Sequence, residues 1–543
     1  MTLAGQLVKN RMGDAAMVDR LLNATAVLGA LILISTPARA QAPFHLQEAT
    51  IDQIRGELMA GRVSCRVLIG HYLKRIEAYD HAGPTLNAVQ TVNRHALDEA
   101  DRLDAAYRAS GPVGPLHCIP VLVKDQVETS DMPTTYGSIL FKQFTPRRDA
   151  TVVKKLKASG AIVIGKTNMG EFAAGYLGSG FGIVRNPYDP ARSPAGSSSG
   201  SGVGVAANFA VLAVAEDTGG SIRGPAAHGN AVGLRPTVPL VSRFGMMPAT
   251  PTQDTLGPIT RTVRDAALML DVIAGYDPND PVTAYVEGHI PNTYTDFLKR
   301  DGLKGAKLGV LRIPLDPKAD SQSNDYQKVR AVIDRALAAM QAQGAHIVDP
   351  IPIPEILKQV DKLYTDNVYE TEQGIDSYLA AHPDAPVKTL RDILLTGRVV
   401  PSRSNRLITN IGKTTSDPGY LSVIQRREEL RQAVLKMMAD LQLDAIVHAT
   451  FDYPPGRIPP EPLTIADPAG VGDLGNNRRL APLLAFPALS VPAGFTPEGL
   501  PVGIEFLGRQ FSEGRLLALG YAFEQATHHR RPPMTTPPLP GEP

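Results

Sequence analysis

Three residues of this sequence combine a reactive side chain with a setting suited to catalysis. Lys124 follows an apolar run rich in β-branched residues, Ser197 lies within the motif GSSSG, and Ser221 ends the motif EDTGGS. A serine hydroxyl is a weak nucleophile and needs a base beside it. A lysine is such a base only when it is neutral, and burial lowers its pKa from the ordinary value of about 10.4. Lys124 is therefore a candidate base for a serine nucleophile.

Other catalytic arrangements fit the sequence less well. GSSSG matches the Gly-x-Ser-x-Gly nucleophile elbow, but an elbow follows a strand, and the preceding residues 189–195 contain two prolines. Lys166 is a second candidate base, because it also follows a strand-like apolar run. His228 lies close after Ser221, but a packed loop residue is the favoured interpretation. The twelve histidines are scattered without a visible ligand set, so neither a metal nor another cofactor is expected.

Taken together, several segments resemble the amidase signature family. Ser197 and Ser221 are separated by 24 residues, as in the family pattern, and the resemblance spans roughly residues 48 to 530. The segments that carry it are LHCIPVLVKD (116–125), NP (186–187), GSSSG (196–200), EDTGGSIRGPA (216–226) and QDTLGP (253–258). Three small residues depart from the pattern by standing where glycine is common, none of them at a catalytic position: Cys118, Ala195 and Ser199.

The resemblance implies a Ser-cisSer-Lys triad. Ser221 is then the nucleophile, Ser197 passes the proton, and Lys124 is preferred to Lys166 as the base. By the same resemblance the Gly196–Ser197 peptide bond is cis. The other expected site residues are backbone donors for the oxyanion, a small-residue loop lining the acyl pocket, and two charges that hold the nucleophile turn: Thr218, Gly219, Gly220 and Ser221; Ala173, Ala174 and Gly175; Asp217 and Arg223.

The predicted function is hydrolysis of carboxylic amides through an acyl-enzyme. The segment 241–248, with GSSSG, looks more like peptide-amide and aryl-acylamide hydrolases than like fatty-acid amide hydrolases. The same residues would also cleave esters or carbamates. A glutamine-dependent amidotransferase subunit shares the signature and is the main alternative. A binding protein with a decayed site is disfavoured, because all three catalytic positions are filled. The expected partner is a small-molecule amide, and the oligomeric state is left open between monomer and homodimer.

The elements that must position these residues alternate between strands and helices, which predicts an α/β fold. The resemblance implies a large central mixed β-sheet covered by helices on both faces. The amidase domain is expected over 41–535, with its core at about 116–260, a variable helical region at about 277–440 and a loose proline-rich tail at 536–543. Strands are expected at 119–123, 161–164, 307–312, 346–348, 445–447, 488–491 and 502–507; helices from Thr50 and Ser64, at 92–107, 150–159 and 512–527, and at the start of 203–215.

Composition and charge exclude several classes of protein. The chain has 543 residues, 43% of them hydrophobic and 20% charged, as in soluble globular proteins. Lys and Arg number 55 against 54 Asp and Glu, which offers no electrostatic case for nucleic acid or an anionic membrane surface. The two cysteines, Cys65 and Cys118, exclude a disulfide scaffold. One disulfide is possible, but two buried thiols are the favoured interpretation, because both lie in segments predicted to be buried.

The N-terminal residues have the pattern of a secretory signal peptide. The apolar run 21–35 follows Arg11 and Arg20, and small residues at Ala38 and Ala40 match an A-x-A cleavage site. The run is short for a bilayer span of about 20 residues, so an uncleaved anchor is the lesser alternative. We expect residues 1–40 to be removed and the protein to be periplasmic or secreted, with no other membrane segment. The true start is left open among Met1, Met12 and Met17.

Overall fold

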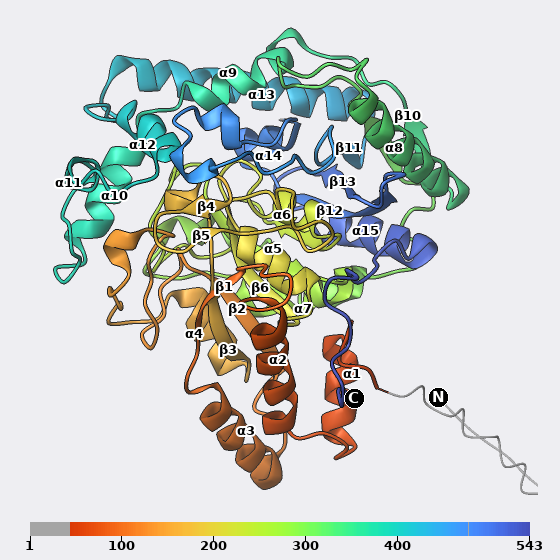
Figure 1. The fold of residues 1–543 in the computed structure, drawn as a ribbon. Helices are drawn as coiled ribbons and strands as arrows, with labels where there is room; N and C mark the ends of the chain where they lie inside the picture. Colours follow the sequence, from red (N-terminus) through yellow and green to blue (C-terminus); the bar gives the residue numbers. More distant parts are fainter. Residues whose placement is uncertain (1–43, 476) are drawn as a thin grey trace, which may run out of the picture. The chain divides into compact units, whose positions relative to one another are not determined.

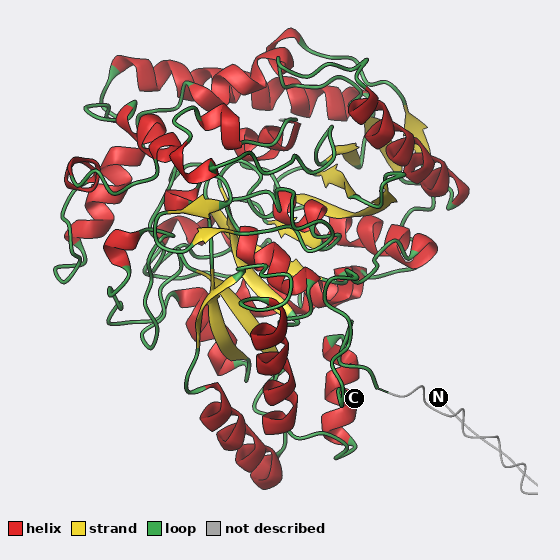
Figure 2. Cartoon of the chain, in the orientation of Figure 1, coloured by secondary structure: helices red, strands yellow, loops and turns green. Residues whose placement is uncertain are grey.

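An 11-stranded mixed β-sheet forms the centre of the described part of the chain (Figures 1 and 2). The computed structural model describes residues 44–475 and 477–543, so the predicted signal peptide lies outside the described residues. Across the sheet the strands are β1 (Val89–Val92), β3 (Ile162–Thr167), β2 (Pro120–Lys124), β6 (Leu212–Asp217), β8 (Thr255–Thr260), β7 (Val232–Arg235), β12 (Ala488–Phe495), β13 (Pro501–Leu507), β11 (Ala445–Ala449), β9 (Lys307–Val310) and β10 (His346–Val348). A two-stranded hairpin, β4 (Leu177–Gly178) and β5 (Gly182–Ile183), stands apart.

The ends of β2 and β6 lie at the same edge of this sheet. The two strands pair in parallel, with Val123 opposite Val214. Because parallel strands end at the same edge, Lys124 at the end of β2 comes close to the turn that follows Asp217 at the end of β6. β8 runs antiparallel to β6 with Thr255 opposite Asp217, which brings the segment before β8 to this edge as well. Three segments distant in the sequence therefore meet there.

Helices flank the sheet, which confirms the predicted fold class. In chain order they are α1 (Ile51–Met59), α2 (Cys65–Tyr79), α3 (Ala96–Ser110), α4 (Thr151–Ala158), α5 (Ser199–Ala206), α6 (Arg223–His228), α7 (Val263–Ile273), α8 (Asn324–Ala342), α9 (Val360–Thr365), α10 (Thr371–Ala380), α11 (Leu390–Leu395), α12 (Pro401–Ile408), α13 (Pro418–Asp440), α14 (Leu480–Leu484) and α15 (Glu513–Thr527). Among the described residues, no helix is both long and apolar enough to cross a membrane.

Successive residues of β12 show that both faces of the sheet are covered. Leu489 contacts α15, where a Cβ on Gly520 would lie 2.5 Å from the Leu489 side chain. Ser490 is paired with Gly233 of β7, and a Cβ on Gly233 would lie 2.6 Å from Ala226 of α6. Neighbouring strand residues point to opposite faces, so α15 and α6 lie on opposite sides. The helices of the region 277–440 run along one side of Figure 1, from α8 through α13.

The first elements show where the sequence pattern worked and where it did not. α1 begins at the predicted capping box of Thr50 and Gln53, and α2 begins after the predicted cap Ser64. The helix predicted from Val92 begins instead at Ala96, because residues 89–92 form the edge strand β1, which pairs with β3. This strand has one long-range partner and no helix-breaking residue, so local sequence does not reveal it.

Cys65 and Cys118 form a disulfide, which corrects the preference for two buried thiols. Cys65 begins α2, and Cys118 lies in a turn before β2 with a φ of 63°. Their Cα atoms are 5.4 Å apart although 53 residues separate them in sequence. Both were correctly expected to be buried, but burial does not decide pairing. The left-handed turn at Cys118, where the family often has glycine, brings the two side chains together.

The C-terminal tail is bound to the domain, in contrast to the expected loose segment. Arg75 of α2 is fully buried and forms an ion pair of 2.9 Å with Glu542. The same guanidinium donates to the carbonyl oxygens of Thr536 at 2.8 Å and Pro537 at 3.1 Å. The backbone N–H of Leu46 donates to the carbonyl of Pro543. The proline-rich composition of the tail predicted mobility, but the tail supplies the acceptors that the buried Arg75 needs.

Candidate active site

Lys124 and Ser197 are in direct contact. Lys124 is fully buried at the end of β2, and its Nζ donates to Ser197 Oγ at 2.8 Å. The same Nζ forms an ion pair of 2.8 Å with Glu216 Oε2. Burial lowers the pKa of Lys124, and the Glu216 carboxylate opposes that shift. The predicted base is therefore desolvated and bonded to the predicted proton bridge.

Close backbone packing positions Ser197 immediately before α5. The Gly196–Ser197 peptide bond is cis, as the family resemblance implied. A Cβ on Gly196 would lie 1.7 Å from the carbonyl oxygen of Gly175, so only glycine fits at this position. The Ser197 carbonyl accepts a hydrogen bond of 3.1 Å from the N–H of Gly170. Ser197 is 1% exposed, which leaves its hydroxyl at the wall of a cavity rather than in bulk solvent.

The turn between β6 and α6 presents Ser221. The Asp217 carboxylate accepts hydrogen bonds from the backbone N–H groups of Gly220 at 2.9 Å and Ile222 at 3.1 Å. Arg223 and Arg235, both fully buried, form ion pairs with the same carboxylate at 3.2 and 2.9 Å. Burial alone raises the pKa of Asp217, but the two arginines hold it well below its usual range. The predicted role of Asp217 and Arg223 in holding the turn is confirmed, and Arg235 joins them.

The backbone N–H of Gly220 was expected to be an oxyanion donor, but it is already bonded within the turn. It is donated to Asp217, so in this arrangement it does not face the cavity. Within the described ranges, the N–H groups of Thr218, Gly219 and Ser221 have no hydrogen-bond partner, and all three residues line the cavity. These three N–H groups are the ones that an oxyanion can use.

Glu216 and Asp254, for which no role was predicted, lie behind Lys124. The Thr218 hydroxyl contacts Glu216 Oε1 and lies 2.7 Å from Asp254 Oδ1. A hydroxyl carries one hydrogen, so it cannot donate to both carboxylates, and one of the carboxyl groups must supply a proton. Burial and, after it, the negative charge of Glu216 raise the pKa of Asp254 to about 7, so Asp254 can supply that proton. A charged residue ending an otherwise apolar strand was the available signal for Glu216.

The two rival residues of the sequence analysis lie elsewhere. Lys166 Nζ is paired with Asp125 at 3.1 Å and donates to Thr134 Oγ1 at 2.8 Å, without contacting either serine. His228 ends α6 and stacks on Phe451 with ring centroids 4.2 Å apart. Burial lowers the pKa of His228 to about 4. Its interpretation as a packed residue agrees with this position.

A cavity of about 280 Å³ joins the predicted residues. Ser197, Ser221 and the oxyanion turn line it together with the small-residue loop Ala173, Ala174 and Gly175, as expected. The rest of its wall comes from segments to which sequence analysis assigned no role: Tyr364, Asn367, Arg403, Arg406, Asn410, Phe451, Asp473, Arg478 and Arg479 are among the lining residues. Lys124 lies beneath this wall and reaches the cavity through Ser197.

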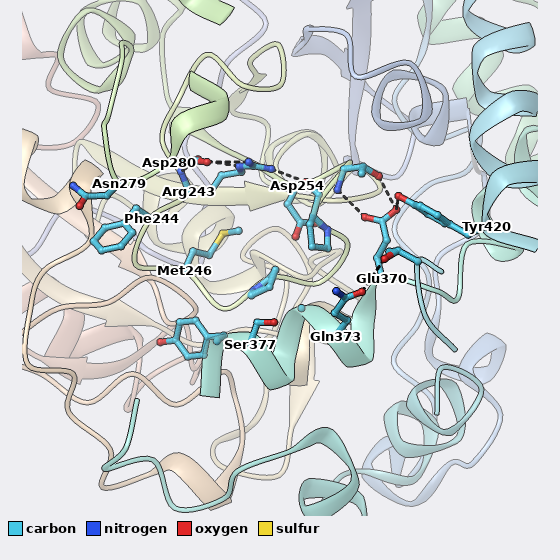
Figure 3. A pocket seen from close by; sticks show the side chains of 16 residues that line it. Arg243, Phe244, Met246, Asp254, Asn279, Asp280, Glu370, Gln373, Ser377 and Tyr420 are labelled. Carbon is cyan, nitrogen blue, oxygen red and sulfur yellow. Dashed lines mark hydrogen bonds and ion pairs between the residues drawn. The ribbon is translucent and has the colours of Figure 1, made fainter. Parts of the chain in front are cut away.

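A second, larger cavity of about 620 Å³ is lined by neither Ser197 nor Ser221 (Figure 3). Its labelled residues include the Arg243–Asp280 ion pair and Glu370, which lies beside Tyr420. Asp254 is the residue that links it to Lys124, through Thr218 and Glu216. Among the described residues, no group of three or more His, Cys, Asp or Glu side chains is arranged to hold a metal ion. Because Ser197 and Ser221 line the smaller cavity, that cavity is the candidate active site.

Comparison with known proteins connects this geometry to a family. The family model described as Amidase matches residues 68–517. A probable amidase of Arabidopsis thaliana is 32% identical over 91% of this chain and 93% of its own length. A glutamyl-tRNA(Gln) amidotransferase subunit of Desulfatibacillum aliphaticivorans is 33% identical over 90% of this chain and 99% of its own. The crystal structure of peptide amidase from Stenotrophomonas maltophilia superposes with a TM-score of 0.81 at 35% identity, covering 91% of this chain and 100% of that one.

Proposed function

The chain belongs to the amidase family and is an amide hydrolase, and from that premise we propose that Ser221 is its nucleophile, Ser197 its proton bridge and Lys124 its base. The observation that carries the proposal is the 2.8 Å hydrogen bond between Lys124 Nζ and Ser197 Oγ, at the wall of the cavity that Ser221 also lines. A neutral, desolvated amine in this position can accept a proton without a histidine or a metal.

In the first half of the proposed reaction, Ser221 Oγ attacks the amide carbonyl carbon. Its proton passes to Ser197 Oγ while the Ser197 proton passes to Lys124 Nζ. The carbonyl oxygen becomes an oxyanion, which the N–H groups of Thr218, Gly219 and Ser221 stabilise. Losing one such donor typically costs about 2.7–4 kcal/mol of transition-state stabilisation.

In the second half the carbon–nitrogen bond breaks. The proton returns through Ser197 to the leaving nitrogen, which departs as ammonia or an amine, and the acyl group stays on Ser221 as an ester. Water gives a proton to Lys124 through Ser197 and attacks that ester; the proton then returns through Ser197 to Ser221 Oγ as the carboxylic acid is released. Ester and carbamate substrates would use the same steps. The amidotransferase alternative, release of ammonia from glutamine, uses the same chemistry and draws support from relatives such as the Desulfatibacillum aliphaticivorans protein.

Labelling with a fluorophosphonate probe tests the nucleophile. The parent protein should react at Ser221, and Ser221→Ala should abolish both labelling and turnover while its circular dichroism spectrum stays unchanged. Ser199→Ala is the matched control, because Ser199 lies in the neighbouring GSSSG motif and its hydroxyl has no partner in the described structure. The control should be labelled like the parent. Turnover by Ser221→Ala at the parental rate would disprove the assignment.

A substrate panel separates the chemical alternatives. We expect hydrolysis of p-nitroanilides or of C-terminal peptide amides, in line with the structural similarity to peptide amidase. Ammonia release confined to glutamine would favour the amidotransferase alternative instead. Esters and carbamates in the same panel test whether the enzyme also hydrolyses these bonds.

We also propose that the protein is exported. Two observations support this: the signal-peptide pattern of residues 1–40 and the Cys65–Cys118 disulfide, a bond that persists mainly in oxidising compartments. Expression in a bacterial host followed by fractionation and N-terminal sequencing tests the proposal. A periplasmic product beginning at Gln41 is expected, and an uncleaved cytoplasmic product contradicts it.

A further inference from the structure

The wall of the active-site cavity is rich in arginine. Arg403 and Arg406 come from α12, and Arg478 and Arg479 come from the 3-10 turn η8 (Asn477–Arg479) that precedes α14. All four are half-buried. A charged guanidinium is rarely removed from solvent without a partner, because its desolvation is costly. The partners of these four residues therefore indicate what the cavity is built to hold.

Three of the four guanidinium groups have no carboxylate partner in the described part of the chain. Arg479 is paired with Asp361 and lies over the ring of Tyr364. Within residues 44–475 and 477–543, Arg403 donates to the carbonyl of Phe172 and Arg406 to that of Thr365 at 3.3 Å, and Arg403 Nε is buried without an acceptor. The Arg478 guanidinium lies 4.1 Å above the ring of Phe451.

Arg478 lies against the turn that carries Ser221. Among the described residues, its buried Nη1 has no acceptor. A Cβ on Gly220 would lie 2.5 Å from Arg478 Cδ, so the side chain crosses the turn that ends in Ser221. A negative group of a substrate bound by Arg478 would therefore lie close to the carbonyl that Ser221 is proposed to attack.

The cavity contains too little negative charge to balance these arginines. Asp473 is the carboxylate among its described lining residues; its charge attracts Arg478, and it also accepts a hydrogen bond of 2.8 Å from Ser193. Burial and, after it, the charge of Arg406 lower the pKa of Arg403 to about 10. Burial and the charge of Arg479 do the same for the pKa of Arg478. With pKa values of about 10, Arg403 and Arg478 remain charged at neutral pH and make this part of the cavity wall positive.

We propose that the substrates of this site are small amides that carry a carboxylate, bound through Arg403, Arg406 and Arg478. The inference rests on the proposed function, because it places the substrate of the Ser221 reaction in this cavity. Arginine favours carboxylate over other polar groups because its planar fork forms two parallel hydrogen bonds to the two oxygens. An anion between the guanidinium groups also relieves their mutual repulsion. The volume of about 280 Å³ suits a short acyl chain rather than a long peptide.

Matched substrates test the inference. Malonyl, succinyl and glutaryl 4-nitroanilides carry a free carboxylate, and each has a neutral counterpart in which an isopropyl group replaces the carboxylate. Release of 4-nitroaniline gives kcat/KM for each pair. For at least one chain length, we expect a preference of tenfold or more for the acid, falling as salt is raised because the attraction is electrostatic. Equal or higher kcat/KM for all three neutral counterparts overturns the inference.

Two variants connect the preference to the arginines. Arg406→Gln should lower the ratio of kcat/KM for acid over neutral substrate by about fivefold or more. Arg406 is chosen because its single side-chain hydrogen bond in the described structure is to a backbone carbonyl, so its loss disturbs the fold least. Arg398→Gln is the control, since Arg398 is an exposed arginine outside the cavity lining and should leave the ratio unchanged. A ratio that responds equally to both variants contradicts the assignment.

A binding readout separates failure of this inference from failure of the proposed function. Succinate and glutarate, the acids released from these substrates, should slow fluorophosphonate labelling of Ser221, whereas 1,4-butanediol should not. Normal labelling without protection by either acid overturns the carboxylate site and leaves the proposed nucleophile intact. Absence of labelling in the parent protein overturns the proposed function itself.

Discussion

At the scale of single residues, Glu216 alters what is expected of Lys124. A buried lysine beside serines becomes neutral through desolvation, but here a fully buried carboxylate lies 2.8 Å from its Nζ. The carboxylate holds Nζ in reach of Ser197 and favours the protonated lysine, which is the inactive form in the proposed mechanism. In the proposed mechanism, Glu216 therefore positions Lys124 and sets the pH above which the lysine is neutral.

Glu216→Gln should move the acidic limb of the pH profile to lower pH. The negative charge of Glu216 opposes the burial that lowers the pKa of Lys124. Without that charge the pKa falls further, and a larger fraction of Lys124 is neutral at a given pH. Measured as kcat/KM between pH 5 and 10, the rising limb should shift by about one pH unit, because loss of a close ion pair changes a pKa by about 1–3 units.

The maximal rate of Glu216→Gln can fall as well, so the position of the limb is the informative quantity. Glu524→Gln provides the control, since Glu524 is a half-buried carboxylate on α15 that accepts from the N–H of Val263 and contacts neither Lys124 nor Ser197. Its limb should stay where the parent's is. An unmoved limb in Glu216→Gln would show that Glu216 is merely structural.

Lys124→Ala should remove most activity at pH 7. General-base catalysis by a positioned side chain contributes about 10²–10⁴-fold, and the variant should lose a factor in that range. Part of the rate should return at high pH, where hydroxide replaces the missing base. The measurement is kcat/KM against pH for parent and variant. Activity at the parental level across the pH range would place the base elsewhere.

At the scale of elements, the unit β6–turn–α6 controls where Ser221 points. Asp217 ends β6 and ties the turn to two buried arginines, so the turn is held from its polar side. Its other side is held by packing: Gly220 has a φ of 117° and lies against Arg478. Both the backbone conformation and the lack of space require glycine there.

Gly220→Ala should lower kcat/KM by about 100-fold, because a displacement of about 1 Å at the reacting group costs that much. The added Cβ would lie 2.5 Å from Arg478 Cδ, so the turn or the arginine must move. Gly499→Ala is the matched control, with a φ of 80° and nothing within 4 Å of the added Cβ. It should cost about 1 kcal/mol of stability without changing kcat/KM. Equal activity of the two variants would contradict the role of the turn.

At the scale of the whole molecule, the disulfide joins the first helices to β2, the strand that ends in Lys124. Cys65 begins α2, and Cys118 lies just before β2. Replacing both by serine should lower the free energy of unfolding by about 4 kcal/mol, the chain-entropy value for a closed loop of this length. Denaturant titration measures the difference. Reductant should destabilise the parent and leave the double variant unchanged, and a parent that is insensitive to reductant contradicts the prediction.

The sheet was predictable in part. Strands with continuous apolar runs, such as β2 and β3, were found because both of their faces are buried. β8 and β7 were not assigned, since their segments contain glycine, proline and arginine and are stabilised by neighbouring strands. The site divides in the same way. Lys124, Ser197 and Ser221 carry a motif, whereas Arg406 and Arg478 lie in segments without one.

The sequence by itself determined the family, the fold class and the three residues of the proposed triad, because backbone turns and a buried lysine impose local requirements that appear as short motifs. Only the tertiary structure decided that Cys65 and Cys118 pair, that Glu216 contacts Lys124, and that arginines from two distant segments line the same cavity as Ser221. These features depend on distances between segments far apart in the chain. Charge and specificity at the site arise from such distances, and no local pattern encodes them.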